Sequence, residues 1–347
     1  MTALDDARRR FDPVPGYLNA ASLGLPPREV VQALRTSLDQ WQRGQAGPAA
    51  YDASVAESRR LFAGLVGVPV ERVAVGSQVS VLAGTVASSL PDGARVVCVD
   101  GDFSSIVFPF LVHADRGVTV RHVPREALAD EVVPGTDLVA FSLAMSACGS
   151  VVDADAVAEA ARRVGATTLC DLTQAAGWMP VDASRFDVTV TAAYKWLCAP
   201  RGSAFMTMTP DVAARVRPTS AGWYAGEDVW ASVYGPGMQL ATDARRFDVS
   251  PAWLCWVGTV PALQLFASLD IAEVRAHDAG LADRLRAELG VDPAGQPVVS
   301  LPDPDGSRLA RLQAAGATVA ARAGRVRIAF HLWNDADDVK LALDALR

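Results

Sequence analysis

Only two of the 32 basic residues in this 347-residue chain are lysines, Lys195 and Lys340; the other 30 are arginines. Lysine, unlike arginine, can lose its proton when it is desolvated and can then act as a nucleophile. Lys340 lies in an amphipathic C-terminal stretch, where a solvated position is expected. Lys195 lies among small and apolar residues in VTAAYKWLCAP, a poor setting for a surface lysine. Lys195 is therefore the first candidate for covalent chemistry.

A carboxylate and an amide precede this lysine in a pattern that suits one cofactor. Asp171 ends the apolar stretch TTLCD, where an unpaired carboxylate is costly to bury. The protonated pyridine nitrogen of pyridoxal 5'-phosphate (PLP) would pair with it and keep the ring an electron sink. Gln174 could donate to the ring oxygen. A lysine in an apolar pocket near a cationic ring has a lowered pKa, which favours a Schiff base on Lys195.

Composition and charge exclude several classes of function. The formal net charge of −7 gives no basic stripe for nucleic acid, and no apolar run reaches the roughly 18–20 residues that span a bilayer. The N-terminus lacks the apolar core of a signal peptide. An odd number of cysteines without metal-ligand spacing predicts reduced thiols, no metal site and a cytoplasmic location: Cys98, Cys148, Cys170, Cys198 and Cys255.

The elements that must position Lys195 and Asp171 alternate along the chain from about residue 60 to 210. Helical patterns separate seven apolar runs, at 73–76, 95–100, 118–123, 137–142, 167–173, 188–193 and 203–208. This alternation predicts an α/β fold, with a mostly parallel seven-stranded sheet between helices. Ligands bind at the carboxyl ends of such strands, and polar runs fall there, at 77–80, 102–105, 142–146, 171–174 and 194–195.

The last 90 or so residues have a different pattern. A helical stretch at 257–289 leads into short strands at 298–302 and 325–330 and a final helix, which predicts a small α+β domain. We expect an N-terminal segment, 1–25, that packs on the small domain, a large PLP-binding domain, 26–247, and a small C-terminal domain, 248–347.

The order of these motifs resembles the class V aminotransferase family of fold-type I PLP enzymes, which includes cysteine desulfurases, kynureninase and isopenicillin-N-epimerase-like proteins. The family pattern is Asp-x-x-Gln-x-x-Gly, Asp-Val, an aromatic–Lys pair and Pro-x-Gly. Here it comprises Asp171, Gln174, Gly177, Asp187, Val188, Tyr194, Lys195, Pro200 and Gly202. The resemblance extends from YLNAASLGLPP at 17–27 to RVRIAFHLWN at 325–334.

The resemblance implies a role for each matching residue in cofactor binding. Lys195 forms the Schiff base and later moves protons, Asp171 pairs with the pyridine nitrogen, and Gln174 bonds the ring oxygen. Phe103 stacks on the ring. The phosphate lies at a helix N-terminus, where the expected contacts are Ser77, Gln78, Val79 and Ser80. Ser250 in RRFDVSP matches a segment that reaches the partner's phosphate, which implies a homodimer with a shared active site.

The substrate side is matched less fully. Arg327 matches the arginine that binds the substrate carboxylate, a role that suits its two-pronged guanidinium. Arg322 and Arg325 lie close by in sequence, so the choice among the three arginines stays open. Asn19 and Trp223 are further candidates for substrate binding, although Trp223 could equally well be a packing residue.

Three departures from the family pattern bear on function. Tyr194 stands where many members have histidine. Ala192 replaces a common serine, so one phosphate contact is missing and Tyr194 is expected to supply another. No cysteine follows Cys255, so the loop with the catalytic cysteine of cysteine desulfurases has no counterpart, which argues against a persulfide relay.

Each residue also has a purely structural interpretation. Lys195 could extend from a strand end to solvent, Asp171 and Ser80 could cap helices, and Phe103 could be a core residue. Cys198 and His331 are expected to be packing and structural residues. The motifs together favour an enzyme that acts on an amino acid or related amine through a Schiff base and a Cα carbanion (quinonoid), foremost by transamination. A β-eliminating C–S lyase, an epimerase and a non-catalytic PLP-fold binding or regulatory protein are the alternatives.

Overall fold

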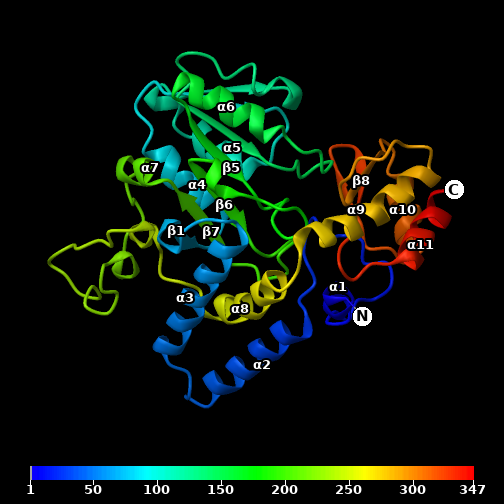
Figure 1. Ribbon diagram of the computed structural model, residues 1–347, viewed down its shortest axis with the longest axis horizontal. Coiled ribbons are helices and arrows are strands. Elements are labelled where there is room, and N and C mark those ends of the chain that lie inside the picture. Colours follow the sequence, from blue (N-terminus) through cyan, green and yellow to red (C-terminus); the bar gives the residue numbers. More distant parts are fainter. Residues whose placement is uncertain (1) are drawn as a thin grey trace.

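The structure is a computed structural model that describes residues 2–347 (Figure 1). Seven strands form its large sheet, in the order β1-β7-β6-β5-β4-β2-β3. Their bounds are β1 Val73–Gly76, β2 Arg95–Val99, β3 Thr119–Val123, β4 Leu138–Ser142, β5 Thr167–Asp171, β6 Val188–Ala192 and β7 Ala204–Met208. Neighbours from β3 to β6 are parallel, and β7 is antiparallel to both β6 and β1. The predicted α/β fold with a mostly parallel seven-stranded sheet is confirmed.

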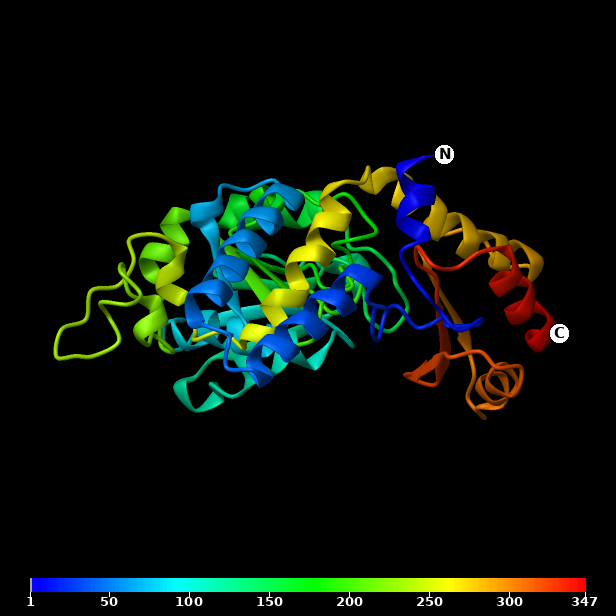
Figure 2. The same cartoon turned by 90° about the horizontal axis from the view of Figure 1, so that it is seen from below.

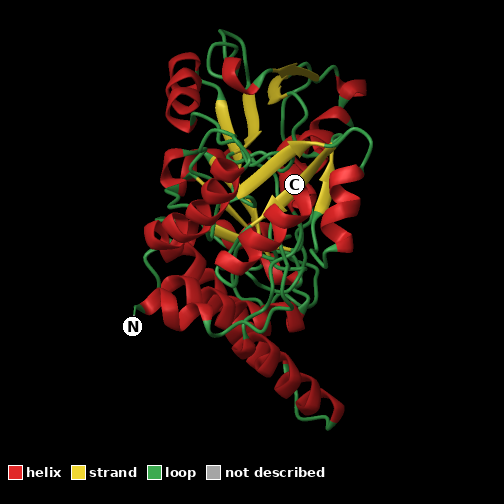
Figure 3. Cartoon of the chain, turned by 90° about the vertical axis from the view of Figure 1, so that its right-hand side faces the viewer, coloured by secondary structure: helices red, strands yellow, loops and turns green. Residues whose placement is uncertain are grey.

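Helices cover both faces of this sheet, which explains why its inner strands are apolar along their whole length. One face packs against α3 (Pro48–Leu65), α6 (Ala154–Val164) and α8 (Trp253–Ala267). The other packs against α4 (Val79–Ser88) and α5 (Ser104–Leu111), with α7 (Pro210–Arg215) at its margin. Successive residues of a strand alternate between the two cores, as Val97 and Cys98 do in β2. Figure 3 shows helices packed around most of the strands.

A small antiparallel sheet, in the order β8-β10-β9, forms the C-terminal module together with three helices. Its strands are β8 Val298–Pro302, β9 Ala320–Arg322 and β10 Arg325–Ala329, and its helices are α9 Ile271–Glu288, α10 Ser307–Ala314 and α11 Ala336–Leu346. The N-terminal segment, with α1 (Ala3–Arg8), joins this module through bridges from Tyr17 to Thr318 and from Asn19 to Ala329. Both chain ends lie beside the small module (Figure 2).

The helical stretch expected at 257–289 is two helices, α8 and α9, bent by 90°. Helix α8 ends at Ala267, and Asp270 caps α9, because its carboxylate accepts from the backbone N–H of Ala272 at 2.8 Å. Helix α8 packs against α3 and α2 (Arg28–Gln42), beside the large sheet. We therefore propose that the small domain begins near this bend rather than at residue 248.

Among residues 2–347, no single helix has both the length and the apolar character to cross a membrane, and only α8 and α9 taken together, despite their bend, meet that test. The same residues contain no group of three His, Cys, Asp or Glu side chains arranged to hold a metal ion.

Candidate active site

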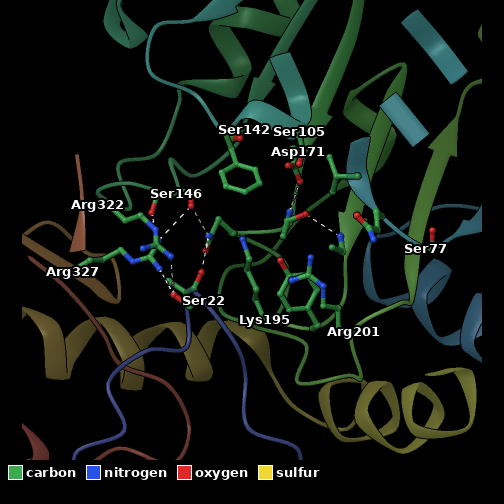
Figure 4. Close-up of a pocket in the computed structure, with 18 residues that line it drawn as sticks. Ser22, Ser77, Ser105, Ser142, Ser146, Asp171, Lys195, Arg201, Arg322 and Arg327 are labelled. Atoms are coloured by element: carbon green, nitrogen blue, oxygen red, sulfur yellow. Dashed lines mark hydrogen bonds between the residues drawn. The ribbon is translucent and has the colours of Figure 1, made fainter. Parts of the chain in front are cut away.

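The carboxyl ends of β1, β2, β4, β5 and β6 meet at one edge of the large sheet, because β1 and β6 are both antiparallel to β7. A cavity of about 270 Å³ opens at this edge, and the small module contributes its far wall (Figure 4). Five of the predicted residues line its centre: Lys195, Asp171, Gln174, Phe103 and Tyr194. Ser77, Gln78 and Val79 line one end of it, and Arg327 also lines it.

Lys195 lies in a tight turn directly after β6 and is only 5% exposed. Two glycines allow this turn to pack closely. A Cβ at Gly24 would lie 1.9 Å from the carbonyl oxygen of Lys195, and one at Gly177, whose φ is +115°, would lie 2.3 Å from that of Trp196. The backbone N–H of Gly24 also donates to the Tyr194 carbonyl at 2.9 Å. Gly177, the glycine of the Asp-x-x-Gln-x-x-Gly motif, therefore leaves room for the lysine turn, and Gly24 holds it.

Burial and neighbouring charges set the protonation of Lys195 and Asp171. Burial lowers the pKa of Lys195 to about 8, although the Asp171 carboxylate opposes the shift. Burial raises the pKa of Asp171 to about 6, and hydrogen bonds from Thr173 oppose it. One of these, from the Thr173 backbone N–H to Oδ1, measures 2.8 Å. A buried carboxylate at a strand end is thus available for a cationic ring nitrogen, as PLP requires.

The Gln174 side chain is held in one orientation by Trp196, the residue after Lys195. The indole N–H can only donate, and it donates to Gln174 Oε1 at 2.7 Å. The amide nitrogen must therefore face the opposite way, where it donates to the Ala21 carbonyl at 3.0 Å and to Ser146 Oγ at 3.1 Å. Gln174 lines the cavity, and its amide nitrogen would donate to the ring oxygen of PLP by exchanging one of these two bonds.

Trp196 is itself held by a buried pair from the small module. His331 Nε2 lies 3.0 Å from the Trp196 carbonyl oxygen, and Nδ1 lies 2.6 Å from Asp278 Oδ2. Both partners are acceptors, so both ring nitrogens must donate and the imidazole is protonated. Burial opposes that charge, but Asp278 and Cys198 together raise the pKa of His331 to about 10. His331 is therefore a structural contact between the modules.

Phe103 follows β2 and presents a partly exposed ring to the cavity, with the Lys195 Nζ 5.2 Å from the ring centroid. Asp102 fixes this position. Its carboxylate accepts from the backbone N–H of Phe103 at 2.7 Å and from the N–H and hydroxyl of Ser142 at 2.8 and 2.6 Å. Phe103 is 43% exposed, which is unusual for a phenylalanine that serves only as a core residue and suits a ring-stacking surface.

The opposite end of the cavity is shaped for an anion. Helix α4 starts there, and its N-cap residue Gln78 makes no side-chain hydrogen bond to the free N–H groups of the first turn. Such N–H groups and the helix dipole bind phosphate. Arg201 also lines the cavity, with its guanidinium carbon 4.9 Å from the centroid of the Tyr194 ring. The uncapped helix, the buried carboxylate of Asp171 and the buried amine of Lys195 together fit PLP.

Arg327 reaches the cavity from β10, is 1% exposed and is bound only to serines and a backbone carbonyl. Its Nη2 donates to Ser22 Oγ at 2.7 Å, and its Nη1 donates to the carbonyl oxygen of Ser146. Burial, and then the charge of Arg322, lower the pKa of Arg327 to about 10. A buried guanidinium with no carboxylate among these partners is suited to an anionic ligand. Figure 4 shows Arg322 and Arg327 together beside Ser22 and Ser146.

Four predicted site residues do not line this cavity: Ser80, Ser250, Asn19 and Trp223. Asn19 acts nearby, because its carbonyl oxygen accepts from the N–H of Ser22 at 2.9 Å and so shapes the turn that presents Ser22. Trp223 packs against Tyr224 and Trp230. Ser250 is exposed, in a segment anchored by the buried pair of Asp248 and Arg59 at 2.5 Å.

Several residues that line the cavity were not predicted as site residues, among them Ser22, Ser105, Ser142, Ser146, Thr173 and Arg201. Ser105, Ser142 and Ser146 belong to polar runs that follow predicted strands, so the strand-end rule could have found them. Ser22 and Arg201 lie within the matching motifs but carry no sequence signal that distinguishes them from ordinary loop residues.

Known proteins resemble the chain over most of its length. The family model described as Aminotransferase class-V matches residues 17–302. An uncharacterized aminotransferase of Bacillus subtilis, YcbU, is 28% identical over 309 residues, which are 83% of this chain and 82% of that protein. Isopenicillin N epimerase of Amycolatopsis lactamdurans is 30% identical over 248 residues, which are 64% of this chain and 61% of that enzyme.

Solved structures share the fold. C-DES, a cystine C-S lyase, has been solved as a variant with glycine covalently linked to its PLP cofactor, and the chain superposes on it with a TM-score of 0.87. The two are 20% identical, and the match covers 98% of each chain. With the family match and a cavity that fits PLP, the chain belongs to the class-V aminotransferase family and is a PLP-dependent enzyme.

Proposed function

We propose that this enzyme transfers the amino group of an amino acid to an α-keto acid, with the residues of the cavity in the roles described above. Bound PLP supplies a carbonyl group that accepts the substrate amine and a ring that withdraws electrons from Cα. Arg327 orients the substrate by its α-carboxylate. Asp171 holds the proton on the ring nitrogen, Gln174 donates to the ring oxygen, and the start of α4 holds the phosphate.

The observation that carries the proposal is that, among the described residues that line this cavity, Lys195 is the one amine, while the Asp171 carboxylate pairs with the ring nitrogen. Lys195, with a pKa of about 8, is suited to accept and return a proton near neutral pH. Tyr194 also lines the cavity, but burial raises its pKa above the usual value. One base on one face of the substrate suffices to remove the Cα proton and deliver it elsewhere on the same face, which is what amino transfer needs. Epimerisation requires delivery of the proton to the opposite face.

The reaction type is tested with the purified enzyme and a panel of amino acids, with and without an α-keto acid. We expect a new amino acid to form only when both substrates are present. Pyruvate and ammonia formed without an acceptor would identify a β-lyase. Loss of optical rotation with no other product would identify an epimerase, and either result would contradict transamination.

The depressed pKa of Lys195 predicts how covalent PLP binding depends on pH. Only the neutral amine attacks the PLP carbonyl, and burial brings the amine's pKa down to about 8. The rate of covalent incorporation into apo-enzyme should therefore rise between about pH 7 and 9 and level off above that. The measurement is the absorbance of the bound chromophore after mixing with PLP. A rate that continues to rise up to pH 10.5 would show an unshifted lysine.

The proposal includes a homodimer in which Ser250 contacts the cofactor phosphate of the partner subunit. Its support is the exposure of Ser250, outside its own cavity, on a segment that Asp248 ties firmly to Arg59 and to the N–H of Val75. In mixed dimers, a Lys195→Ala subunit should restore PLP affinity to a Ser250→Ala subunit. A monomer in sedimentation velocity at micromolar concentration would contradict this arrangement.

We also place the enzyme in the cytoplasm, without nucleic-acid or membrane partners. All five cysteines are free thiols, as expected in a reducing compartment, and the net charge of −7 is unfavourable for binding to phosphate backbones. Cell fractionation with an antibody to the native protein would check the location.

A further inference from the structure

The small sheet places three arginines on one of its faces. In the register of β9 and β10, Arg325 lies opposite Arg322, and Arg327 lies opposite Ala320. Opposite residues of antiparallel strands share a face, and so do residues two apart along one strand. Arg322, Arg325 and Arg327 therefore project from the same face, although like charges directly opposite each other are destabilising.

A strained turn enforces this register. Only Ala323 and Gly324 separate the two strands, with φ of 50° and 69°, as a two-residue hairpin of this kind requires. Glycine adopts this conformation freely, but for alanine it is uncommon and costly. The hairpin that carries Arg322 therefore has two unfavourable features: the strained backbone at Ala323 and the two positive charges of Arg322 and Arg325 opposite each other.

The three arginines have different partners. Arg325 turns back along the sheet, where its Nε and Nη2 bond the hydroxyl and carbonyl oxygens of Ser300 at 2.9 and 2.7 Å. It does not line the cavity, whereas Arg322 and Arg327 both do. Their guanidinium groups converge on one atom, Ser22 Oγ, with Nη2 distances of 3.5 Å from Arg322 and 2.7 Å from Arg327.

Among the described residues that line the cavity, no carboxylate is left to pair with Arg322. Asp171 is the only carboxylate among them, and its role is to pair with the ring nitrogen. Among residues 2–347, the Arg322 guanidinium donates to the carbonyl oxygen of its neighbour Ala321 at 2.7 Å and to the shared Ser22, and to no carboxylate. In the proposed function, the α-carboxylate of the substrate binds the deeply buried Arg327, so it is not the partner of Arg322. Arg322 is a second cation at the same wall, and its exposed side chain is suited to a second anionic group.

We propose that the substrate is an amino acid with an acidic side chain, and that Arg322 binds its distal acidic group while Arg327 binds the α-carboxylate. This inference rests on the proposed function, since it concerns the substrate of the same cavity. The distal group is a carboxylate or another oxyanion that can accept two parallel N–H bonds from a guanidinium.

Matched pairs of amino acids test the proposal on the holoenzyme. Aspartate and asparagine, or glutamate and glutamine, have the same shape and differ in one charge. Their dissociation constants are obtained from the change in absorbance of the bound cofactor. We expect the acidic member of one pair to bind at least about tenfold more tightly than its amide, as a charge-assisted contact in a partly closed site would give.

Arg322→Gln should reduce that preference to within about threefold and leave the binding of the neutral amide unchanged. Arg325→Gln removes the same charge from the same face of the sheet outside the cavity, so it should leave the preference intact. Arg327→Gln should weaken both members of the pair.

Three outcomes would overturn the inference. The wild-type enzyme could bind amide and acid equally well, Arg322→Gln could weaken both equally, or Arg325→Gln could abolish the preference as fully as Arg322→Gln. Equal weakening would show that Arg322 shares the α-carboxylate with Arg327. Failure of the proposed function has a different signature, because acidic amino acids would then bind selectively without any transfer of their amino group to a keto acid.

Discussion

Replacing Lys195 by alanine is expected to abolish covalent PLP attachment and to lower the rate of amino transfer by at least about a thousandfold. Lys195 has two tasks in the cavity, covalent attachment and proton transfer, and no other lysine can take them over. The only other one, Lys340, is exposed on α11. The visible absorbance of the purified variant and its steady-state rate are the measurements.

Lys340→Ala is the matched control, because it removes the same side chain from a solvated helix. This variant should keep the visible absorbance (yellow colour) of covalently bound PLP and the full steady-state rate of amino transfer. Reduction of the holoenzyme with borohydride, followed by peptide mapping, should place the PLP label on the peptide that contains Lys195. A colourless wild-type protein that takes up no added PLP would refute the assignment, and so would a label found on Lys340.

Asp171→Asn is expected to lower activity by about a hundredfold to a thousandfold while leaving PLP covalently bound. An amide of the same shape keeps the packing of the strand end and can still accept from the Thr173 N–H. It cannot hold a proton on the ring nitrogen by charge, so the ring withdraws electrons from Cα less strongly. The rate of Cα–H exchange in deuterated buffer measures this loss directly.

A cofactor analogue supplies the control for Asp171. Wild-type enzyme reconstituted with a PLP analogue that has carbon in place of the ring nitrogen should lose activity to a similar degree. Asp171→Asn should cause little further loss in that background, since both changes remove one interaction and their effects should not add. Additive losses would show that Asp171 acts elsewhere, for example by holding the backbone near Thr173.

The large sheet and the centre of the cavity could be predicted because their signals are local. Strands buried on both faces are apolar throughout, and a polar residue at the end of such a strand stands out, as Asp171 does. Lys195 was conspicuous because lysine is so rare in this chain. The pKa values of Asp171 and Lys195 are shifted by burial at the ends of these strands and by the charge that each group places near the other.

Features that depend on long-range packing could not be predicted in the same way. The bend between α8 and α9 interrupts a region that is helical on both sides, and only tertiary packing sets its angle. The orientation of the Gln174 amide depends on Trp196, which lies 22 positions away. Distinguishing Arg325 from Arg322 and Arg327 required their side-chain contacts, because the three residues are almost equivalent in sequence and only Arg325 turns away from the cavity to Ser300.

The contacts of the N-terminal segment have a consequence for how the enzyme is made. Gly24 is synthesised about half a chain length before the lysine turn on which it packs, and Ser22 is synthesised 305 residues before Arg327, to which it is bonded. The contact between Ser22 and Arg327 cannot form on a nascent chain that still lacks β10, whereas Gly24 can pack as soon as the lysine turn has been made. The cavity wall that carries Arg322 and Arg327 is therefore completed only after β9 and β10 have been synthesised, whereas Phe103, Asp171, Gln174 and Lys195 are all made earlier.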